Sequence, residues 1–259
     1  MRVCRVIGHV VATAKHPAIQ GKKILVVTES PGRGDPATPM GLAVDGVALV
    51  GEHGDYPMNE RGQRLYPRYE LFMQIIEVMK QDGLVCPIFV DKPFSYSWGK
   101  ASEMYETAKS MGIPLMAGSS CPLAQRRPPI ELPRGARIAE AVSIHGGPLE
   151  AYGFHALEVL QSFVEARAGG ETGVTSVEYL RGRQLWNAAR QGRWSLKLAE
   201  AAMQADLGEL PKSIRQVPGE PRVTSDGLLI EYADGLKATM LNIGKNDTRW
   251  NFACRLKGE

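Results

Sequence analysis

Lys92 and His155 are the two residues whose types and settings best suit proton chemistry. Lys92 directly follows an apolar run, where its ammonium group can donate a hydrogen bond to a polarised oxygen. His155 follows the pair Gly146 and Gly147 and lies near the start of an expected helix, where an imidazole can act as a general acid or base. An exposed loop lysine and a buried, hydrogen-bonded structural histidine would explain the same residues.

His53, Asp55 and Arg126 are candidates for ligand binding. His53 and Asp55 follow the apolar run 44–51, and ligands bind at the carboxyl ends of strands in open α/β sheets. A turn in which Asp55 caps the next element is equally compatible with them. Arg126 precedes a second arginine and two prolines, which suits either a carboxylate or phosphate site or a solvated loop. Because His53, Asp55, His145 and His155 lack the spacing of metal ligands, we expect no metal.

The segments that would position these residues alternate between strand and helix from residue 44 onward. Apolar runs at 44–51, 85–93 and 113–120 predict strands, and the segments 68–83 and 98–112 predict helices. In the first helix Leu71, Ile75, Val78 and Met79 recur at helical spacing, and Gly83 suits a C-cap. This alternation with short links predicts right-handed crossovers and a parallel sheet.

Residues after 120 follow a different pattern. We expect helices at 152–170 and 193–206, strands at 174–182 and 250–259, and a β-hairpin over 227–244. At the other end of the chain, the Val- and Ile-rich runs 2–13 and 22–27 predict a β-hairpin or two barrel strands. The predicted organisation is therefore a β segment at 1–28, a linker at 29–43, an α/β domain at 44–120 and an α+β domain at 121–259.

Composition narrows the class of protein. The chain has 259 residues, of which 44% are hydrophobic and 23% charged, as in ordinary globular proteins. A net charge of +3 is too small to indicate a nucleic-acid or membrane partner. The four cysteines form no Cys-x-x-Cys pair and indicate free thiols in a reducing compartment. We expect a cytoplasmic protein, with a bacterial microcompartment as the alternative location, that assembles as a homo-oligomer.

From residue 44 onward the motifs resemble the glucose–fructose oxidoreductase and inositol dehydrogenase family, in particular its uncharacterised bacterial members. The similar motifs, in chain order, are VDGVALVGE at 44–52, Asp91-Lys92-Pro93, Leu115-Met116-Ala117-Gly118, Gly146-Gly147 and Ala151-Tyr152-Gly153-Phe154-His155. In that family the second motif reads Glu-Lys-Pro and the last reads Asp-x-Gly-x-His. Here Asp91 replaces the glutamate, and Ala151 replaces the aspartate beside Glu150.

This resemblance implies both a fold and an activity. The implied fold is an α/β protein with a partial Rossmann-like parallel sheet, followed by an α+β domain with an open, mostly antiparallel sheet. The implied activity is NAD(P)-dependent oxidation or reduction of a CH–OH group in a small sugar-like substrate. Lys92 and His155 match the family's catalytic residues. We further expect His53, Asp55, Asp91 and Pro93 to contact NAD or NADP, and Glu150, Tyr152 and Arg126 to contact substrate.

The loop that normally binds the dinucleotide pyrophosphate is missing from the sequence. No Gly-x-Gly-x-x-Gly follows the first strand, and the nearest glycines, Gly32 and Gly34, are flanked by Pro31 and Pro36. The sequence therefore leaves open whether an oxidoreductase relative that lacks this loop is active. An inactive α/β scaffold is one alternative.

A second resemblance covers residues 1–28. The opening of the chain, MRVCRVIGHVVATAKHPAIQGKKILVV, resembles the bacterial microcompartment vertex proteins of the ethanolamine-utilisation N and carboxysome type. That family forms small β-barrels that assemble as pentamers at shell vertices. The resemblance implies microcompartment shell proteins as partners and a vertex-type structural role as the other alternative function. A hairpin without the rest of the barrel would have to dock on the α/β part or on a partner's sheet.

Overall fold

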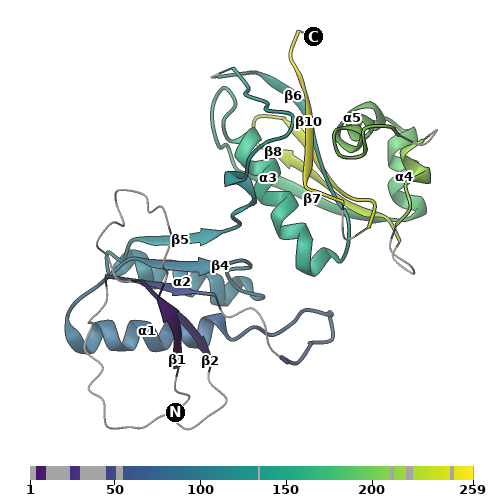
Figure 1. The fold of residues 1–259 in the computed structure, drawn as a ribbon. Helices are drawn as coiled ribbons and strands as arrows, with labels where there is room; N and C mark the ends of the chain where they lie inside the picture. The colour runs from purple at the N-terminus through teal and green to yellow at the C-terminus, as the bar shows by residue number, and fades with distance from the viewer. Residues whose placement is uncertain are drawn as a thin grey trace. The chain divides into compact units, whose positions relative to one another are not determined.

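The computed structural model describes residues 4–9, 24–29, 45–50, 55–133, 135–210, 213–219, 224–245 and 248–258. The chain divides into two compact units, residues 1–119 and residues 120–259. Each unit contains one five-stranded sheet and its own helices (Figure 1). None of the helices in the described ranges is long and apolar enough to cross a membrane.

The sheet of the first unit has the strand order β1-β2-β3-β4-β5. Strands β2 to β5 are parallel neighbours, and β1 pairs with β2 in antiparallel fashion. The predicted hairpin is therefore present, but it extends the α/β sheet rather than forming a structure of its own. The strands are β1 (Cys4–His9), β2 (Ile24–Glu29), β3 (Gly46–Leu49), β4 (Ile88–Asp91) and β5 (Leu115–Gly118).

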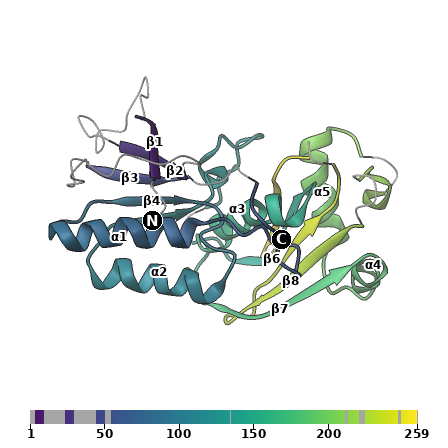
Figure 2. The ribbon, with the colours of Figure 1, turned by 90° about the horizontal axis from the view of Figure 1, so that it is seen from below.

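Helices α1 (Arg68–Asp82) and α2 (Trp98–Ser110) cover one face of this sheet and run side by side (Figure 2). Alternate strand residues, Leu49 and Val90 among them, pack with both helices into one core. Gly83 ends α1 with φ 65°, in the left-handed conformation that a C-cap requires, as predicted. The parallel sheet and its crossover helices are thus those that the apolar periodicity predicts.

The sheet of the second unit has the order β10-β6-β9-β8-β7. Three of its four pairings are antiparallel, in agreement with the predicted mostly antiparallel sheet, whereas β6 and β9 are parallel. The strands are β6 (Ile138–His145), β7 (Val174–Arg181), β8 (Asp226–Tyr232), β9 (Lys237–Asn242) and β10 (Asn251–Leu256). The parallel pairing could not be read from the sequence because β6 and β9 lie far apart in the chain.

Helices pack on both faces of the second sheet. Helix α3 (Phe154–Val164), preceded by a π-helical turn (Leu149–Gly153), covers one face, which we call the α3 face. Helices α4 (Arg183–Arg190) and α5 (Leu196–Leu207) pack on the other, which we call the α5 face (Figure 1). The short helix α4 was not predicted. Its residues Leu185 and Ala188 are buried against the sheet, so packing rather than periodicity fixes this helix.

Candidate functional site

Lys92 lies directly beyond the carboxyl end of β4 in the first unit. Its side chain is buried, with only 8% of the residue exposed. Asp91 is the last residue of β4, is half-buried and lies opposite Gly118 of β5. Pro93 completes the motif, so these three residues lie together at the edge where parallel strands end. Asp55 is exposed in the segment after β3, and His53 lies outside the described residues.

His155 lies in the first turn of α3 in the second unit, packed against Trp250. The two ring centroids are 4.9 Å apart in an edge-to-face arrangement. Trp250 also contacts the ring of Tyr152, and its indole Nε1 donates a hydrogen bond to the Tyr152 carbonyl oxygen at 3.1 Å. The π-helical turn that holds Tyr152 and Glu150 is thereby tied to the segment before β10. Trp250 was not among the predicted site residues.

His145 is the last residue of β6 and is completely buried behind this cluster. Its Nδ1 lies 3.1 Å from the carbonyl oxygen of Gly146, while its Nε2 has no hydrogen-bond partner. Burial, reinforced by the nearby His155, lowers the pKa of His145 to about 4, and the Gly146 carbonyl opposes that shift only in part. His145 is therefore neutral near pH 7. The sequence indicated it only as a member of a rejected metal set.

Gly146 brings the end of β6 against the chain after β9. A Cβ atom at this position would lie 1.9 Å from the carbonyl oxygen of Lys245 and 2.8 Å from Cβ of Thr248. Only glycine fits such an approach, because any side chain would begin inside the neighbouring backbone. This contact holds the loop that leads to Trp250 next to the end of β6.

The other predicted substrate contacts divide into two groups. Glu150 lies in the π-helical turn beside Tyr152, and burial raises the pKa of its carboxyl group. Arg126 lies elsewhere: its guanidinium is over the ring of Phe163, 4.1 Å from the centroid, and donates to the Ile130 carbonyl at 3.2 Å. Phe163 is about 12 Å further along α3 than His155. The structure therefore brings His155, Tyr152 and Glu150 together, and Arg126 does not join them.

The described residues do not fit the pyrophosphate of a dinucleotide. A pyrophosphate site needs a glycine-rich loop that opens a helix. In the described part of the first unit, α1 begins after Pro67, and α2 begins after Ser97, whose side chain accepts a bond from the Lys100 amide. Gly32 and Gly34 lie outside the described residues. No group of three or more potential metal ligands occurs in the ranges that the structure covers.

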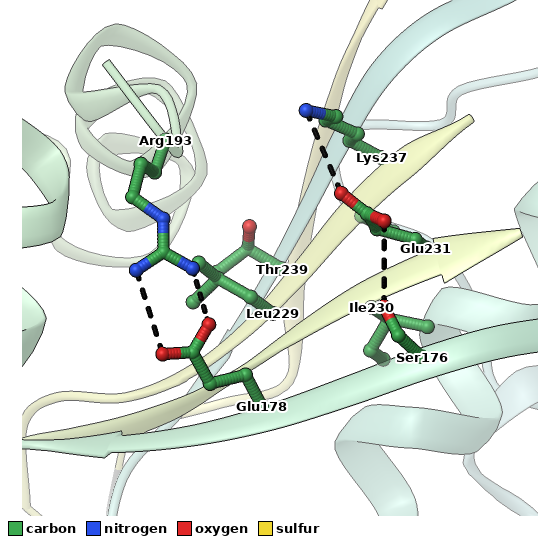
Figure 3. Close-up of a pocket in the computed structure, with 9 residues that line it drawn as sticks. Ser176, Glu178, Arg193, Leu229, Ile230, Glu231, Lys237 and Thr239 are labelled. Atoms are coloured by element: carbon green, nitrogen blue, oxygen red, sulfur yellow. Dashed lines mark hydrogen bonds and ion pairs between the residues drawn. The ribbon is translucent and has the colours of Figure 1, made fainter. Parts of the chain in front are cut away.

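A separate hollow of about 80 Å³ lies on the α5 face, over β7, β8 and β9 (Figure 3). Its charged side chains pair with one another: Glu178 with Arg193, and Glu231 with Lys237 at 3.5 Å. Ser176 Oγ also donates to Glu231, at 3.4 Å. These pairs leave the hollow with a satisfied and largely exposed lining, unlike the buried cluster around His145.

Three comparisons relate this chain to known proteins. Residues 1–53 match the model of the family described as "Ethanolamine utilisation protein EutN/carboxysome", which confirms the resemblance predicted for the N-terminal segment. A search of curated proteins found no match. The solved structures that are similar to this chain include sugar dehydrogenases.

One of these structures is D-galactose-1-dehydrogenase from Rhizobium etli, 13% identical over 83% of this chain and 58% of that chain, with a TM-score of 0.42. Another is UDP-N-acetylglucosamine 3-dehydrogenase from Acidithiobacillus ferrooxidans, 10% identical over 83% and 55%, with a TM-score of 0.42. A third, GenD2 from gentamicin A biosynthesis, was solved with NAD and is 14% identical over 82% and 54%, with a TM-score of 0.41. The chain spans about half the length of the solved proteins it matches.

Proposed function

We propose that this protein is a relative of the NAD(P)-dependent sugar oxidoreductases and that its second unit binds a sugar-like substrate at His155. The observation that carries the proposal is the contact of His155 with Trp250, 4.9 Å between ring centroids, beside the buried neutral His145. The motifs from Asp91 to His155 support the same function. The substrate would be a small molecule with several hydroxyl groups.

His155 would exchange a proton with a substrate hydroxyl. Its ring is packed edge-to-face with Trp250, and the indole is itself fixed by its bond to the Tyr152 carbonyl. A fixed imidazole is suited to accept a hydroxyl proton. The faces of Trp250 and Tyr152 offer apolar surface for the C–H groups of a sugar ring.

Lys92 would act as a hydrogen-bond donor at the end of β4 in the first unit. Its burial at the end of β4 supports this role, since an ammonium group that is largely removed from water interacts strongly with a nearby oxygen. NAD or NADP would supply the hydride chemistry. The described residues of the first unit do not fit the pyrophosphate of that cofactor.

Calorimetric titration of the full chain with a panel of hexoses and cyclic polyols tests the proposal. We expect binding by the wild-type protein and weaker binding by His155→Ala. Tyr232→Phe is the matched control, because Tyr232 contacts α3 at Gln161, well away from His155. Absence of any binding up to millimolar sugar would refute the proposed function.

The same protein is then titrated with NADH and NADPH and assayed for sugar oxidation. Micromolar cofactor binding with turnover that is lost in both Lys92→Ala and His155→Ala would establish an active oxidoreductase. No cofactor binding up to millimolar, together with retained sugar binding, would establish a sugar-binding relative without dehydrogenase activity.

A second candidate function is association with a bacterial microcompartment shell. The family-model match over residues 1–53 favours it. Mass photometry of the full chain tests it, and a vertex-type role predicts a five-fold assembly. Deleting residues 1–28 should abolish that assembly, whereas a five-fold particle that survives the deletion would exclude this role. The deletion also removes β1 and nearly all of β2 from the first sheet, so a circular dichroism spectrum is the necessary control.

A further inference from the structure

Strand β7 is the outermost strand of the second sheet (Figure 2), and among the described residues it pairs only with β8. All but one of its eight residues are exposed. The free edge of a strand can pair with another chain, and proteins usually protect such edges with lysine, proline or a covering element. β7 contains neither lysine nor proline, and its one break in register, between Val174 and Ser176, lies at its beginning. The stretch after that break is therefore an unprotected edge.

Two large side chains lie exposed on this edge: Val177 is 56% exposed and Tyr179 is 49% exposed. The register places them opposite Ile230 and Leu228 of β8, whose side chains join the core on the α3 face, so Val177 and Tyr179 lie on that face too. Helix α3 packs mainly on β6, β9 and β10, which leaves both side chains open to solvent. β7 therefore presents apolar side chains beside its free backbone edge, as in strands that pair with another chain.

The direction of the backbone groups of β7 follows from its ladder with β8. The amide of Gly182 donates to the carbonyl oxygen of Ser225 at 2.8 Å, so these two opposed residues form a hydrogen-bonded pair. In an antiparallel ladder such pairs alternate with pairs that are not hydrogen-bonded. Counting back from Gly182, the even-numbered residues of β7 bond to β8. Val177, Tyr179 and Arg181 therefore point their N–H and C=O groups away from the sheet.

A second copy of this chain is the partner that fits this edge. A two-fold axis through Glu178 would place two carboxylates opposite each other, and an axis through Val177 would draw the break in register at residue 175 into the ladder. An axis through Tyr179 uses only the regular residues 177–181. It also brings two aromatic rings together across the strands, and such cross-strand pairs stabilise sheets.

We propose that two copies of this chain form a dimer by pairing their β7 strands in antiparallel fashion about an axis through Tyr179. Tyr179 then lies opposite the partner's Tyr179, and Val177 lies opposite the partner's Arg181. The outward backbone groups of both strands exchange hydrogen bonds, and the two five-stranded sheets become one continuous sheet. The homo-oligomer that we expect from the sequence thereby gains a defined surface, which is separate from the proposed sugar site.

Sedimentation velocity of the full chain over a range of concentrations tests the proposal. A single strand pair is a small interface, so we expect a dimer at about 100 µM that dissociates toward monomer at about 1 µM. Tyr179→Lys places two like charges on the axis and should raise the dissociation constant of the dimer at least about tenfold. Tyr105→Lys is the matched control and should leave the dimer unchanged, because Tyr105 is similarly exposed, at 53%, on α2 of the first unit.

An equimolar mixture of Tyr179→Lys and Tyr179→Glu tests the position of the axis. Residue 179 lies opposite its own counterpart, so opposite charges meet only in the mixed dimer, which should form although neither variant dimerises alone. Val177→Pro is the second variant, because replacing Tyr179 also removes its side-chain hydrogen bond with Asp226. Proline removes an outward N–H without breaking a bond to β8 and should weaken the dimer. Circular dichroism checks that each variant is folded.

Three outcomes would overturn the proposal. The first is a wild-type chain that stays monomeric at about 100 µM. The second is an assembly whose mass is the same in the wild type and in folded Tyr179→Lys and Val177→Pro, whatever its symmetry, because β7 would then not hold it together. The third is failure of the two charge variants to pair when mixed, which would exclude an axis through Tyr179.

Discussion

On the α5 face of the second sheet, the charged side chains find their partners within the protein, whereas on the α3 face several polar atoms do not. Glu178 pairs with Arg193 over the hollow of Figure 3, and both side chains are more than 40% exposed. His145 on the opposite face is fully buried, and its Nε2 is unpaired.

The two faces differ in how their polar groups are satisfied: by ion pairs and water on the α5 face, and incompletely on the α3 face. An exposed ion pair is compensated by water and contributes little to stability, so it can be removed at little cost. A buried acceptor without a donor destabilises the free protein and becomes satisfied only when a donor arrives. The α5 face is therefore a solvated surface, whereas the α3 face covers polar atoms that have no partner among the described residues. Four predictions test this contrast, from the largest expected effect to the smallest.

Gly146→Ala should destabilise the second unit by about 3 kcal/mol, because the added methyl group would meet the Lys245 carbonyl at 1.9 Å. Urea denaturation measures the free energy of unfolding. Gly99→Ala is the control: its Cβ would meet nothing closer than 3.9 Å, and alanine in α2 should be neutral or slightly stabilising. Equal stability of Gly146→Ala and the wild type would show that the close contact at the end of β6 is absent.

His145 should make the second unit less stable in acid. Its folded pKa of about 4 lies below the ordinary value of 6.5, so the unfolded state takes up a proton that the folded state does not. Stability should fall by up to about 3 kcal/mol as the pH decreases from 6.5 toward 4. His145→Leu should remove this pH dependence in parallel denaturation series.

Other groups behave differently in that range. Arg167 lowers the pKa of Asp234 to about 2, so the stabilisation from Asp234 is present above the carboxyl's unfolded pKa and is lost only toward pH 2. Asp226 has a pKa raised by burial and would gain protons in the folded state, which opposes the loss from His145. Comparison with His145→Leu isolates the contribution of His145 to the pH dependence of the free energy of unfolding. The same acid slope in both proteins would contradict a neutral buried His145.

Trp250→Phe should destabilise the second unit by about 1 kcal/mol, because it removes the hydrogen bond from Nε1 to the Tyr152 carbonyl. It should also weaken sugar binding, since the π-helical turn loses its tie to the segment before β10. Thermal denaturation and calorimetry measure the two effects. Trp98→Phe, at a site that is 87% exposed, should change neither. Unaltered sugar affinity in Trp250→Phe would remove Trp250 from the site.

Glu178→Gln should leave both stability and sugar binding unchanged, because water replaces the exposed contact with Arg193. The double variant Glu178→Gln with Arg193→Gln should behave in the same way. Differential scanning calorimetry at low and high salt checks the result. A clear loss of sugar binding in either variant would move the site to the α5 face and reverse the comparison.

The strands and helices of the first unit could be read from the sequence, because local periodicity determines them. Leu71 and Met79 recur at helical spacing and are both buried, and Gly83 ends the helix as predicted. The resemblance of the N-terminal segment was equally local and is confirmed by the match at residues 1–53. The assignments of Lys92 and His155 as catalytic residues remain predictions.

Trp250 and His145 were missed because their roles depend on distant parts of the chain. Trp250 reaches Tyr152, which is 98 residues away, and no spacing rule joins them. A histidine at the end of an apolar strand could be bonded on both nitrogens or on one, and only the packing of Gly153 and Gly146 decides this.

The sequence by itself determined the alternation of elements, the end of α1 and the N-terminal likeness, since these depend on neighbouring residues along the chain. Only the tertiary structure decided that β1 and β2 join the first sheet, that β6 pairs with β9, and which polar atoms are buried without a partner. The physical reason is that strand pairing and hydrogen-bond satisfaction depend on contacts between backbone and side-chain groups that lie far apart in the sequence. Local periodicity does not encode such contacts.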